Sequence, residues 1–362
     1  MEYRLFFTSD YRLSTLFFMK KNKSINPAAR QQFKRRKPLT VEAYVKGILE
    51  GNRVVLSRAI TLIESTRTDH QEQAQAIIAA CLPHARASVR IGVTGTPGVG
   101  KSTFIEALGK HVTGAGHRIA VLAIDPTSQV TRGSILGDKT RMAALATNEN
   151  AFIRPSPAGD SLGGVARKTR ETIVLCEAAG YDIVLVETVG VGQSETAVHS
   201  MVDFFLLLLL PGAGDELQGI KRGIVEMADL IAINKADKNK LKPAQQAKQA
   251  YKNALHLYPP QFSGWIPEVL TCSALEGTGI TEIWHTIQAY KTATQTNDFW
   301  QKNRTRQAKF WLYETIKNDL SNSFFTHKKI KEVLPRVEAD VAAGRLSPFK
   351  GAEELMDLFL GT

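Results

Sequence analysis

The spacing of hydrophobic residues changes several times along the chain, and each change marks a predicted structural element. Short continuous apolar runs predict strands that are buried on both faces, whereas apolar residues three or four positions apart predict helices that cover a sheet. From residue 88 to about residue 294 the two patterns alternate. The predicted strands are 89–94, 118–124, 150–153, 182–187, 202–210, 229–234 and 267–272, and the predicted helices lie near 101–114, 139–147, 164–179, 220–227, 242–256 and 279–293.

This alternation predicts an α/β fold, in which helices flank a mainly parallel central sheet and a ligand binds at the carboxyl ends of the strands. Helical spacing continues on both sides of the alternating region. Thr40 is a predicted N-cap before it, and Pro335 lies inside one of the helices after it. The flanking helices are predicted over 40–66 and about 70–82, and then over 299–320, 328–341 and 351–360.

The formal net charge of +11 suggests a nucleic-acid partner until the charge is located. Residues 1–40 contain ten Lys and Arg against Glu2 and Asp10, a net charge of +8, which leaves +3 for the other 322 residues. Since nucleic-acid binding needs a basic face on a folded domain, we expect no nucleic-acid partner.

The basic segment 1–37 alternates aromatic and basic residues without a stable period. Three interpretations are open: a disordered arm, a start upstream of a true initiator at Met19, or an organelle transit peptide. The acidic residues and the lack of a clear amphipathic helix count against the transit peptide. We expect a poorly ordered, dispensable tail.

The three cysteines, Cys81, Cys176 and Cys272, are far apart and form no C-x-x-C pair. They indicate neither a disulfide framework nor a thiolate metal site, so a reducing, cytoplasmic compartment is expected. The longest apolar run, 204–210, ends at Pro211 and is too short to cross a bilayer. No membrane partner is therefore expected.

The stretch Gly95-Thr-Pro-Gly-Val-Gly-Lys-Ser102 fits the phosphate-binding pattern G-x-x-x-x-G-K-[ST] between a predicted strand and a predicted helix. Glycines allow backbone N–H groups and a helix N-terminus to surround a phosphate, Lys101 adds a positive charge, and Ser102 offers a hydroxyl to Mg²⁺. A glycine-rich turn that matched the pattern by chance would not need to lie between a strand and a helix. The predicted phosphate-binding residues are Gly95, Pro97, Gly98, Val99, Gly100, Lys101, Ser102 and Thr103.

A second motif, Asn234-Lys235-Ala-Asp237, follows the predicted strand 229–234 and matches the N-K-x-D motif of GTP-binding proteins. The carboxylate of Asp237 can accept two hydrogen bonds from guanine, and adenine offers no such pair. Alone, N-K-x-D is a common surface turn, but its place after a strand favours base recognition. Ser273, Ala274 and Leu275 follow the last predicted strand and resemble the weaker companion motif that faces guanine O6.

Three carboxylates follow predicted strands or loops near the phosphate site. Glu187 begins Glu187-Thr-Val-Gly190, which occupies the place of the D-x-x-G motif, and Gly190 N–H can sense the γ-phosphate. Asp125 and Asp138 are further candidates for the metal shell. Glu187 could instead be a solvated loop residue, and either aspartate could cap a helix. The predicted metal ligands are Ser102, Asp125, Asp138 and Glu187, and the predicted catalytic residues are Lys101, Glu187 and Gly190.

Together these motifs resemble those of the MeaB/ArgK-type G proteins, the GTPase chaperones of adenosylcobalamin-dependent methylmalonyl-CoA mutase, to which the human methylmalonic aciduria type A protein belongs. The resemblance covers residues 40–362. It rests on 97–103, 125–128, 133–141, 187–195, 212–220 and 234–237.

The resemblance implies a homodimeric, Mg²⁺-dependent GTPase that gates cobalamin transfer to the mutase and protects it. It assigns Lys101 to the phosphates and Asp237 to guanine, makes 212–223 a third switch, and makes the C-terminal helices the dimerisation arm. Together with the element pattern, this predicts four parts: a basic, disordered tail 1–37, an N-terminal helical extension 38–87, a P-loop G domain 88–295, and a C-terminal arm 296–362.

Val191 follows Gly190 at the position where Ras-type enzymes place the water-orienting Gln, and the nearest Gln is Gln193. We therefore expect slow intrinsic hydrolysis that a partner protein accelerates. Two other functions remain in view. One is a P-loop kinase that phosphorylates a small molecule or an amino-acid transport component; the other is a nickel-delivery metallochaperone, which would need a His-rich or Cys-His tract that the sequence lacks.

Overall fold

The computed structural model describes residues 39–85, 88–124, 142–155, 162–188, 194–212 and 222–361. The chain divides into two units, Met1–Thr40 and Val41–Thr362, and the architecture below is that of the second unit. The predicted tail and the alternative initiator Met19 lie outside the described residues.

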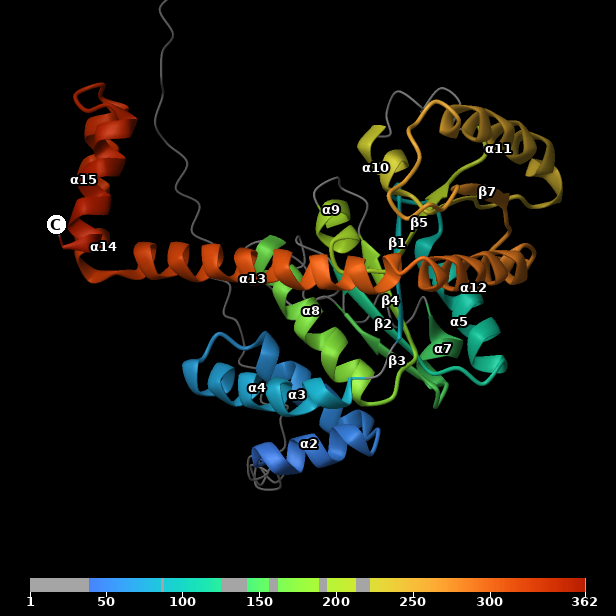
Figure 1. The fold of residues 1–362 in the computed structure, drawn as a ribbon, viewed down its shortest axis with the longest axis horizontal. Helices are drawn as coiled ribbons and strands as arrows, with labels where there is room; N and C mark the ends of the chain where they lie inside the picture. Colours follow the sequence, from blue (N-terminus) through green and yellow to red (C-terminus); the bar gives the residue numbers. More distant parts are fainter. Residues whose placement is uncertain are drawn as a thin grey trace, which may run out of the picture. The chain divides into compact units, whose positions relative to one another are not determined.

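A parallel sheet forms the centre of the second unit (Figure 1). Its strands are β1 (Val89–Gly95), β2 (Ile119–Ile124), β3 (Ala151–Arg154), β4 (Ile183–Thr188), β5 (Phe204–Leu209), β6 (Leu230–Ile233) and β7 (Glu268–Thr271). The order is β3-β2-β4-β1-β5-β6-β7, and every pairing among the described strands is parallel. The seven predicted strands are confirmed, and β1 lies in the middle of the sheet.

Helices cover both faces of the sheet, as the apolar strands require. One face packs against α5 (Lys101–Gly114), α7 (Ala143–Thr147) and α12 (Ile280–Thr296), and the other against α8 (Leu162–Ala178), α9 (Ser194–His199), α10 (Arg222–Met227) and α11 (Leu241–Leu255). Successive residues of β5 point to opposite faces of the sheet. Leu206 packs in the core beneath α5 and α12, and Leu207 packs in the core beneath α10 and α11. The sequence pattern did not predict α9, which has only six residues.

In the described part of the chain, three α-helices precede β1, where the sequence pattern predicts two. They are α2 (Val41–Leu49), α3 (Arg53–Glu64) and α4 (Thr68–Cys81), followed by the short η1 (Leu82–His84). The single helix predicted over 40–66 is wrong, because Gly51 has φ +72° and Asn52 caps a new helix. The Asn52 side chain accepts hydrogen bonds from the N–H groups of Val54 and Val55, at 3.0 and 3.1 Å. The α3 and α4 helices pack against α8.

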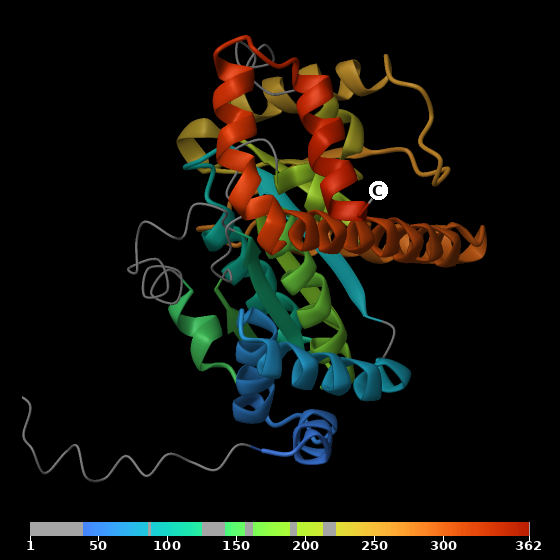
Figure 2. The same cartoon turned by 90° about the vertical axis from the view of Figure 1, so that its left-hand side faces the viewer.

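The chain ends in α13 (Phe299–Thr326), α14 (Lys328–Ala342) and α15 (Pro348–Leu360). The α14 and α15 helices lie side by side (Figure 2) and share a small apolar cluster of Ile330, Val337 and Leu355. The α13 helix continues to Thr326, six residues beyond its predicted end at residue 320.

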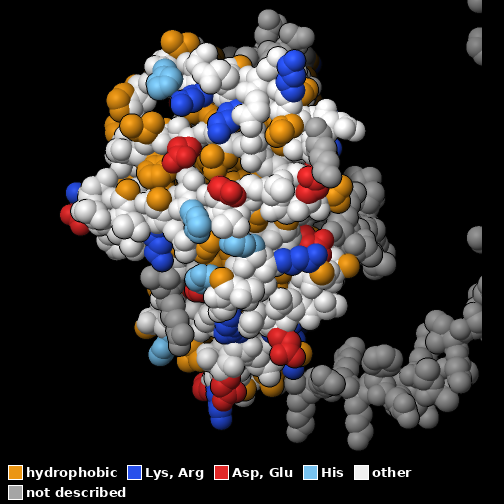
Figure 3. All heavy atoms as spheres, turned by 90° about the vertical axis from the view of Figure 1, so that its right-hand side faces the viewer, with side chains coloured by type: hydrophobic (Ala, Val, Ile, Leu, Met, Phe, Trp, Pro, Cys, Tyr) orange, Lys and Arg blue, Asp and Glu red, His pale blue; other side chains and the backbone are white. Residues whose placement is uncertain are grey.

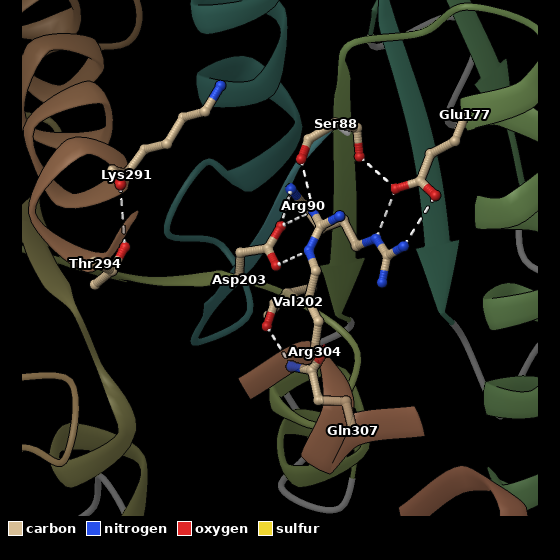
Figure 4. Close-up of polar contacts among 9 residues, drawn as sticks. All are labelled: Ser88, Arg90, Glu177, Val202, Asp203, Lys291, Thr294, Arg304 and Gln307. Carbon is tan, nitrogen blue, oxygen red and sulfur yellow. Dashed lines mark hydrogen bonds and ion pairs between the residues drawn. The ribbon is translucent and has the colours of Figure 1, made fainter. Parts of the chain in front are cut away.

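The first half of α13 is fastened to the sheet by buried polar contacts (Figure 4). Arg304 forms an ion pair with Asp203 at 2.6 Å, and the Gln307 side chain donates to Val202 O at 2.7 Å. Beside this pair, Arg90 and Glu177 form a second, partly buried ion pair at 2.8 Å. The segment before β5 is therefore held between β1 and α13.

Candidate functional site: a nucleotide pocket at the carboxyl edge of the sheet

The phosphate loop runs from the end of β1 into α5, and its glycines have conformations that other residues rarely adopt. Gly95 has φ +151°, and a Cβ at this position would clash with the carbonyl oxygen of Leu208 on the neighbouring strand β5. Gly100 has φ +95° and is the N-cap of α5. A Cβ on Gly100 would lie 2.9 Å from the side-chain nitrogen of Asn234. The loop therefore fits closely against two other segments of the site.

Lys101 lies in the first turn of α5 and is buried. Its Nζ donates to the carbonyl oxygens of Gly95 at 2.8 Å and Thr96 at 3.3 Å, so the ammonium group lies within the loop. Burial lowers the pKa of Lys101, while the negative charges of Glu187 and Glu195 act in the opposite direction. A buried ammonium group at a helix N-terminus is suited to bind a phosphate.

Two candidate metal ligands meet where β4 ends and α5 begins. Ser102 Oγ donates to Glu187 Oε1 at 3.3 Å, although the two residues are 85 positions apart. Beside them, Thr188 Oγ1 donates to Thr94 Oγ1 at 2.8 Å, which ties the ends of β4 and β1 together. A hydroxyl and a carboxylate suit Mg²⁺, which takes oxygen ligands and keeps several waters and phosphate oxygens.

The other two predicted ligands, Asp125 and Asp138, and the predicted catalytic Gly190 lie outside the described residues. Among the residues that the structure describes, no group of three or more His, Cys, Asp or Glu side chains could hold a metal ion. The pair formed by Ser102 and Glu187 is thus the described part of the predicted magnesium shell.

Asn234 connects the base-recognition motif to the phosphate loop. Its Nδ2 donates to Val99 O at 2.8 Å, and its Oδ1 accepts from Ala274 N at 3.1 Å. The next residue, Lys235, has φ +59°, and its Nζ donates to Gly98 O at 2.7 Å. Three segments that are distant in sequence therefore form one surface at the carboxyl edge of the sheet.

Asp237, the predicted guanine-selecting residue, is held by Ser273, whose hydroxyl donates to Asp237 Oδ1. Ser273 Oγ also accepts from Glu276 N at 3.2 Å, which fixes the hydroxyl in the turn after β7. Ala274 is buried in the same turn, while the Leu275 side chain is 82% exposed. The structure thus places both parts of the predicted base site together, with a carboxylate in a fixed orientation.

The sequence did not single out two features of this site. One is the hydrogen-bonded pair of Thr94 and Thr188; the only signal is a threonine at the end of each of two neighbouring strands. The other is Glu195, a buried carboxylate in the first turn of α9 whose charge acts on Lys101. The motif 187–195 includes Glu195, but its burial depends on α9, which was not predicted.

The surface over α5, α11 and α12 carries basic and acidic side chains interspersed with apolar ones (Figure 3). No basic patch dominates the part of this face that the structure describes. Within the described ranges no helix is both long and apolar enough to cross a membrane.

A parallel sheet with a phosphate loop, a strand-end carboxylate and an Asn-Lys-x-Asp motif at one edge defines a P-loop nucleotide-binding protein of the G-protein class. The sequence model of the family described as "Methylmalonyl Co-A mutase-associated GTPase MeaB" matches residues 56–329. The chain belongs to this family of GTPases.

Similar proteins agree with this assignment. The mouse (Mus musculus) methylmalonic aciduria type A homolog is 46% identical over 329 residues, which cover 88% of this chain and 79% of the mouse protein. The GTPase ArgK of Escherichia coli is 45% identical over 318 residues, covering 88% of this chain and 96% of ArgK. A crystal structure described as an LAO/AO transport system kinase is 38% identical, with a TM-score of 0.71, and covers 93% of this chain and 99% of that one.

Proposed function

We propose that this protein is a GTP-binding and GTP-hydrolysing chaperone that gates adenosylcobalamin loading into an acyl-CoA mutase, such as methylmalonyl-CoA mutase, and protects that enzyme in the cytoplasm. Membership of a mutase-associated GTPase family supports the client, as does the mouse relative. The observation that carries the nucleotide assignment is Asn234, which joins the phosphate loop to the turn that holds Asp237.

In the proposed reaction, water attacks the γ-phosphate in line with the departing GDP. Lys101 and the loop N–H groups would stabilise the negative charge that develops on the phosphate oxygens. The Lys101 ammonium group is already held in the loop by its hydrogen bond to Gly95 O. Ser102 and Glu187, with Asp125 and Asp138, would hold Mg²⁺, which supplies further charge stabilisation. Asp237 would accept the guanine N–H groups, and Gly190 N–H would detect the γ-phosphate.

Hydrolysis is proposed to be slow until a partner binds, because Val191 cannot orient a water molecule as Gln does. The segment 212–223 would pass the nucleotide state to the mutase, since it leads into α10. Single-turnover hydrolysis of GTP with saturating Mg²⁺ tests this point. A rate without partner that equals the rate with the mutase present would contradict it.

A homodimer is proposed through the C-terminal helices. Several apolar side chains of α13 are 45–63% exposed, and among them Leu312, Tyr313, Ile316 and Leu320 recur at helical spacing. Such a stripe on one helix is the kind of surface that a second copy of the chain would cover.

Capture from an extract of the native cells tests the client directly. The bait is the protein loaded with a non-hydrolysable GTP analogue, and the matched control is Lys101→Met, which should not retain the nucleotide. We expect a cobalamin-dependent acyl-CoA mutase among proteins retained only by the loaded bait. If such a mutase is present in the extract but is not retained, the chaperone proposal is wrong, whereas retention of the analogue by the bait tests the nucleotide site separately.

The kinase alternative is tested as well, because a similar crystal structure is described as a transport system kinase. A kinase would transfer labelled γ-phosphate to an acceptor other than water. We expect all the label in inorganic phosphate when cell extract is added as a source of acceptors. Label in a small molecule or a transport component would favour the kinase.

A further inference from the structure

A cavity of about 330 Å³ opens at the amino ends of β5 and β6, the edge of the sheet opposite the phosphate loop. Its walls include His199 at the end of α9, Phe205 in β5, Met227 at the end of α10, the loop 258–263, and Asn303 in α13. This volume lies in the range that small-molecule sites occupy. The α9 helix follows the segment that contains Gly190, and α10 follows the segment 213–221, which belongs to the proposed third switch. The cavity contacts both of these helices.

Side-chain hydrogen bonds fix the loop that forms one wall and the residues directly after it. Trp265 Nε1 donates to Asp229 O at 3.0 Å, and Asn297 Nδ2 donates to Ser263 O at 2.8 Å. The rings of Trp265 and Tyr290 meet edge to face, with centroids 5.5 Å apart. The cavity is therefore formed before any ligand arrives, which lowers the entropic cost of binding.

The chemical character of the cavity comes from one buried carboxyl group among aromatic rings. Asp229 is 7% exposed, and its Oδ2 accepts from Phe205 N at 2.8 Å. Burial raises the pKa of Asp229 to about 8, although the Phe205 N–H acts in the opposite direction. Tyr258 and Phe262 line the same cavity, and Phe262, at 95% exposure, lies at its mouth.

The other charged groups around the cavity largely cancel. Asp203 is paired with Arg304, and Glu226 and Arg306 are both exposed and opposite in charge. Burial lowers the pKa of His199, which keeps it neutral near pH 7. The remaining titratable lining groups are Tyr258 and Tyr290, and burial raises the pKa of Tyr290. Asp229 is therefore the group whose charge a ligand would change.

We propose that this cavity binds a small organic cation, an ammonium group on an apolar or aromatic body, with the ammonium beside the Asp229 carboxylate and the body between the rings. Aromatic faces and a carboxylate both favour a cation, and burial strengthens the charge-assisted hydrogen bond. At pH 7 the bound cation would displace the proton of Asp229 to solvent. The site is separate from the nucleotide pocket, and the inference does not depend on the mutase as client.

Isothermal titration calorimetry with three probes of similar shape tests the proposal: phenethylammonium, 2-phenylethanol and 3-phenylpropionate. At pH 7, in two buffers of different ionisation enthalpy, phenethylammonium should bind and release close to one proton per ligand. The alcohol and the acid should bind at least about tenfold more weakly, because they lack a charge-assisted bond to the carboxylate. Binding of all three with equal affinity, or of none, would overturn the proposal.

Two variants and a control locate the binding. Asp229→Asn keeps an oxygen for the Phe205 N–H but cannot ionise, so it should weaken phenethylammonium about tenfold and abolish proton release. Phe262→Ala removes an exposed ring and should also weaken binding without disturbing the fold. Leu257→Ala, directly before the loop 258–263 and 84% exposed but outside the cavity, should leave phenethylammonium binding unchanged. Unchanged binding in Phe262→Ala, or in folded Asp229→Asn, would contradict the assignment.

Discussion

The side-chain amide of Asn234 donates a hydrogen bond of 2.8 Å to the carbonyl oxygen of Val99, 135 residues earlier in the chain. Through this bond the end of β6 supports the phosphate loop that follows β1. Asn234 Oδ1 also accepts from Ala274 N, so the same side chain supports the turn after β7. The phosphate site and the base site are therefore connected through the side chain of Asn234.

Replacing Asn234 with alanine should weaken both nucleotide binding and the fold. Buried groups on Val99 and Ala274 would lose their partner, which costs about 1–3 kcal/mol of the free energy of unfolding. We expect GDP affinity to fall by at least about tenfold, since the loop loses its support. Denaturant unfolding and fluorescent GDP binding measure the two effects. Asn253→Ala, on the surface of α11, is the control and should leave both quantities unchanged.

Asp237→Asn should change which base the protein selects. The asparagine side chain can still accept from Ser273, but it lacks the carboxylate that accepts both guanine N–H groups. The affinity for GDP should fall by about 100-fold, which is the loss of one or two charge-assisted hydrogen bonds. The xanthine nucleotide carries an oxygen in place of the guanine amine, so the side-chain amide introduced by the substitution can donate to it. Competition binding should show xanthosine diphosphate preferred over GDP; continued preference for GDP would exclude Asp237 from the base site.

Lys101→Met should nearly abolish GTP hydrolysis and leave the stability of the fold almost unchanged. The ammonium group is buried, and its interactions with Gly95 and Thr96 offset the cost of removing it from water. The free energy of unfolding should change by less than about 1 kcal/mol, while GTP hydrolysis falls by at least about 100-fold. The matched control is Lys110→Met on the outer side of α5, where the side chain is 57% exposed. Equal hydrolysis in the two variants would contradict the role of Lys101.

Asp229→Asn should remove a pH dependence from the stability of the protein. Because the pKa of Asp229 is raised to about 8 in the folded chain, from 3.8, the folded state holds a proton that the unfolded state has lost. Wild-type stability should therefore fall as pH rises between these values, by up to about 1.4 kcal/mol per pH unit, and level off above about pH 8. The difference between wild-type and variant unfolding curves isolates this contribution. A difference that is constant with pH would show that Asp229 is ionised in the folded protein.

Leu320→Glu combined with Leu312→Glu should convert the proposed dimer to a monomer. Both side chains are exposed on α13, at 60% and 59%, so the charges cost little in a monomer but would be buried in a dimer. Light scattering after size exclusion should give the mass of one chain, with an unchanged melting temperature. Ile266→Glu, equally apolar and 79% exposed on the loop before β7, is the control and should remain dimeric. A monomeric wild-type protein would contradict the proposed arm.

The sheet was predictable because its strands are buried on both faces and therefore read as continuous apolar runs. The break between α2 and α3 was missed since apolar spacing continues across Gly51 and Asn52, and only the capping bonds end the helix. The six-residue α9 was missed because so short a helix carries too little periodic pattern.

The site was predictable as a set of motifs but not as a set of contacts. The residue types at positions 95–103 and 234–237 indicate which groups meet the phosphates and the base. Asn234 contacts Val99, 135 positions away, and Ser102 contacts Glu187, 85 positions away. Both contacts depend on the order of the strands in the sheet. The burial of Glu195 likewise depends on the packing of α9, and the cavity beside Asp229 depends on five separate segments.

Two separate calorimetric titrations of the purified, magnesium-supplemented protein, one with GDP and one with ADP, test the central claim most directly. The account predicts saturable heat for GDP at one site per chain, and an ADP affinity at least about 100-fold weaker, because adenine cannot satisfy the Asp237 carboxylate. No heat with GDP, or equal affinity for the two nucleotides, would contradict it.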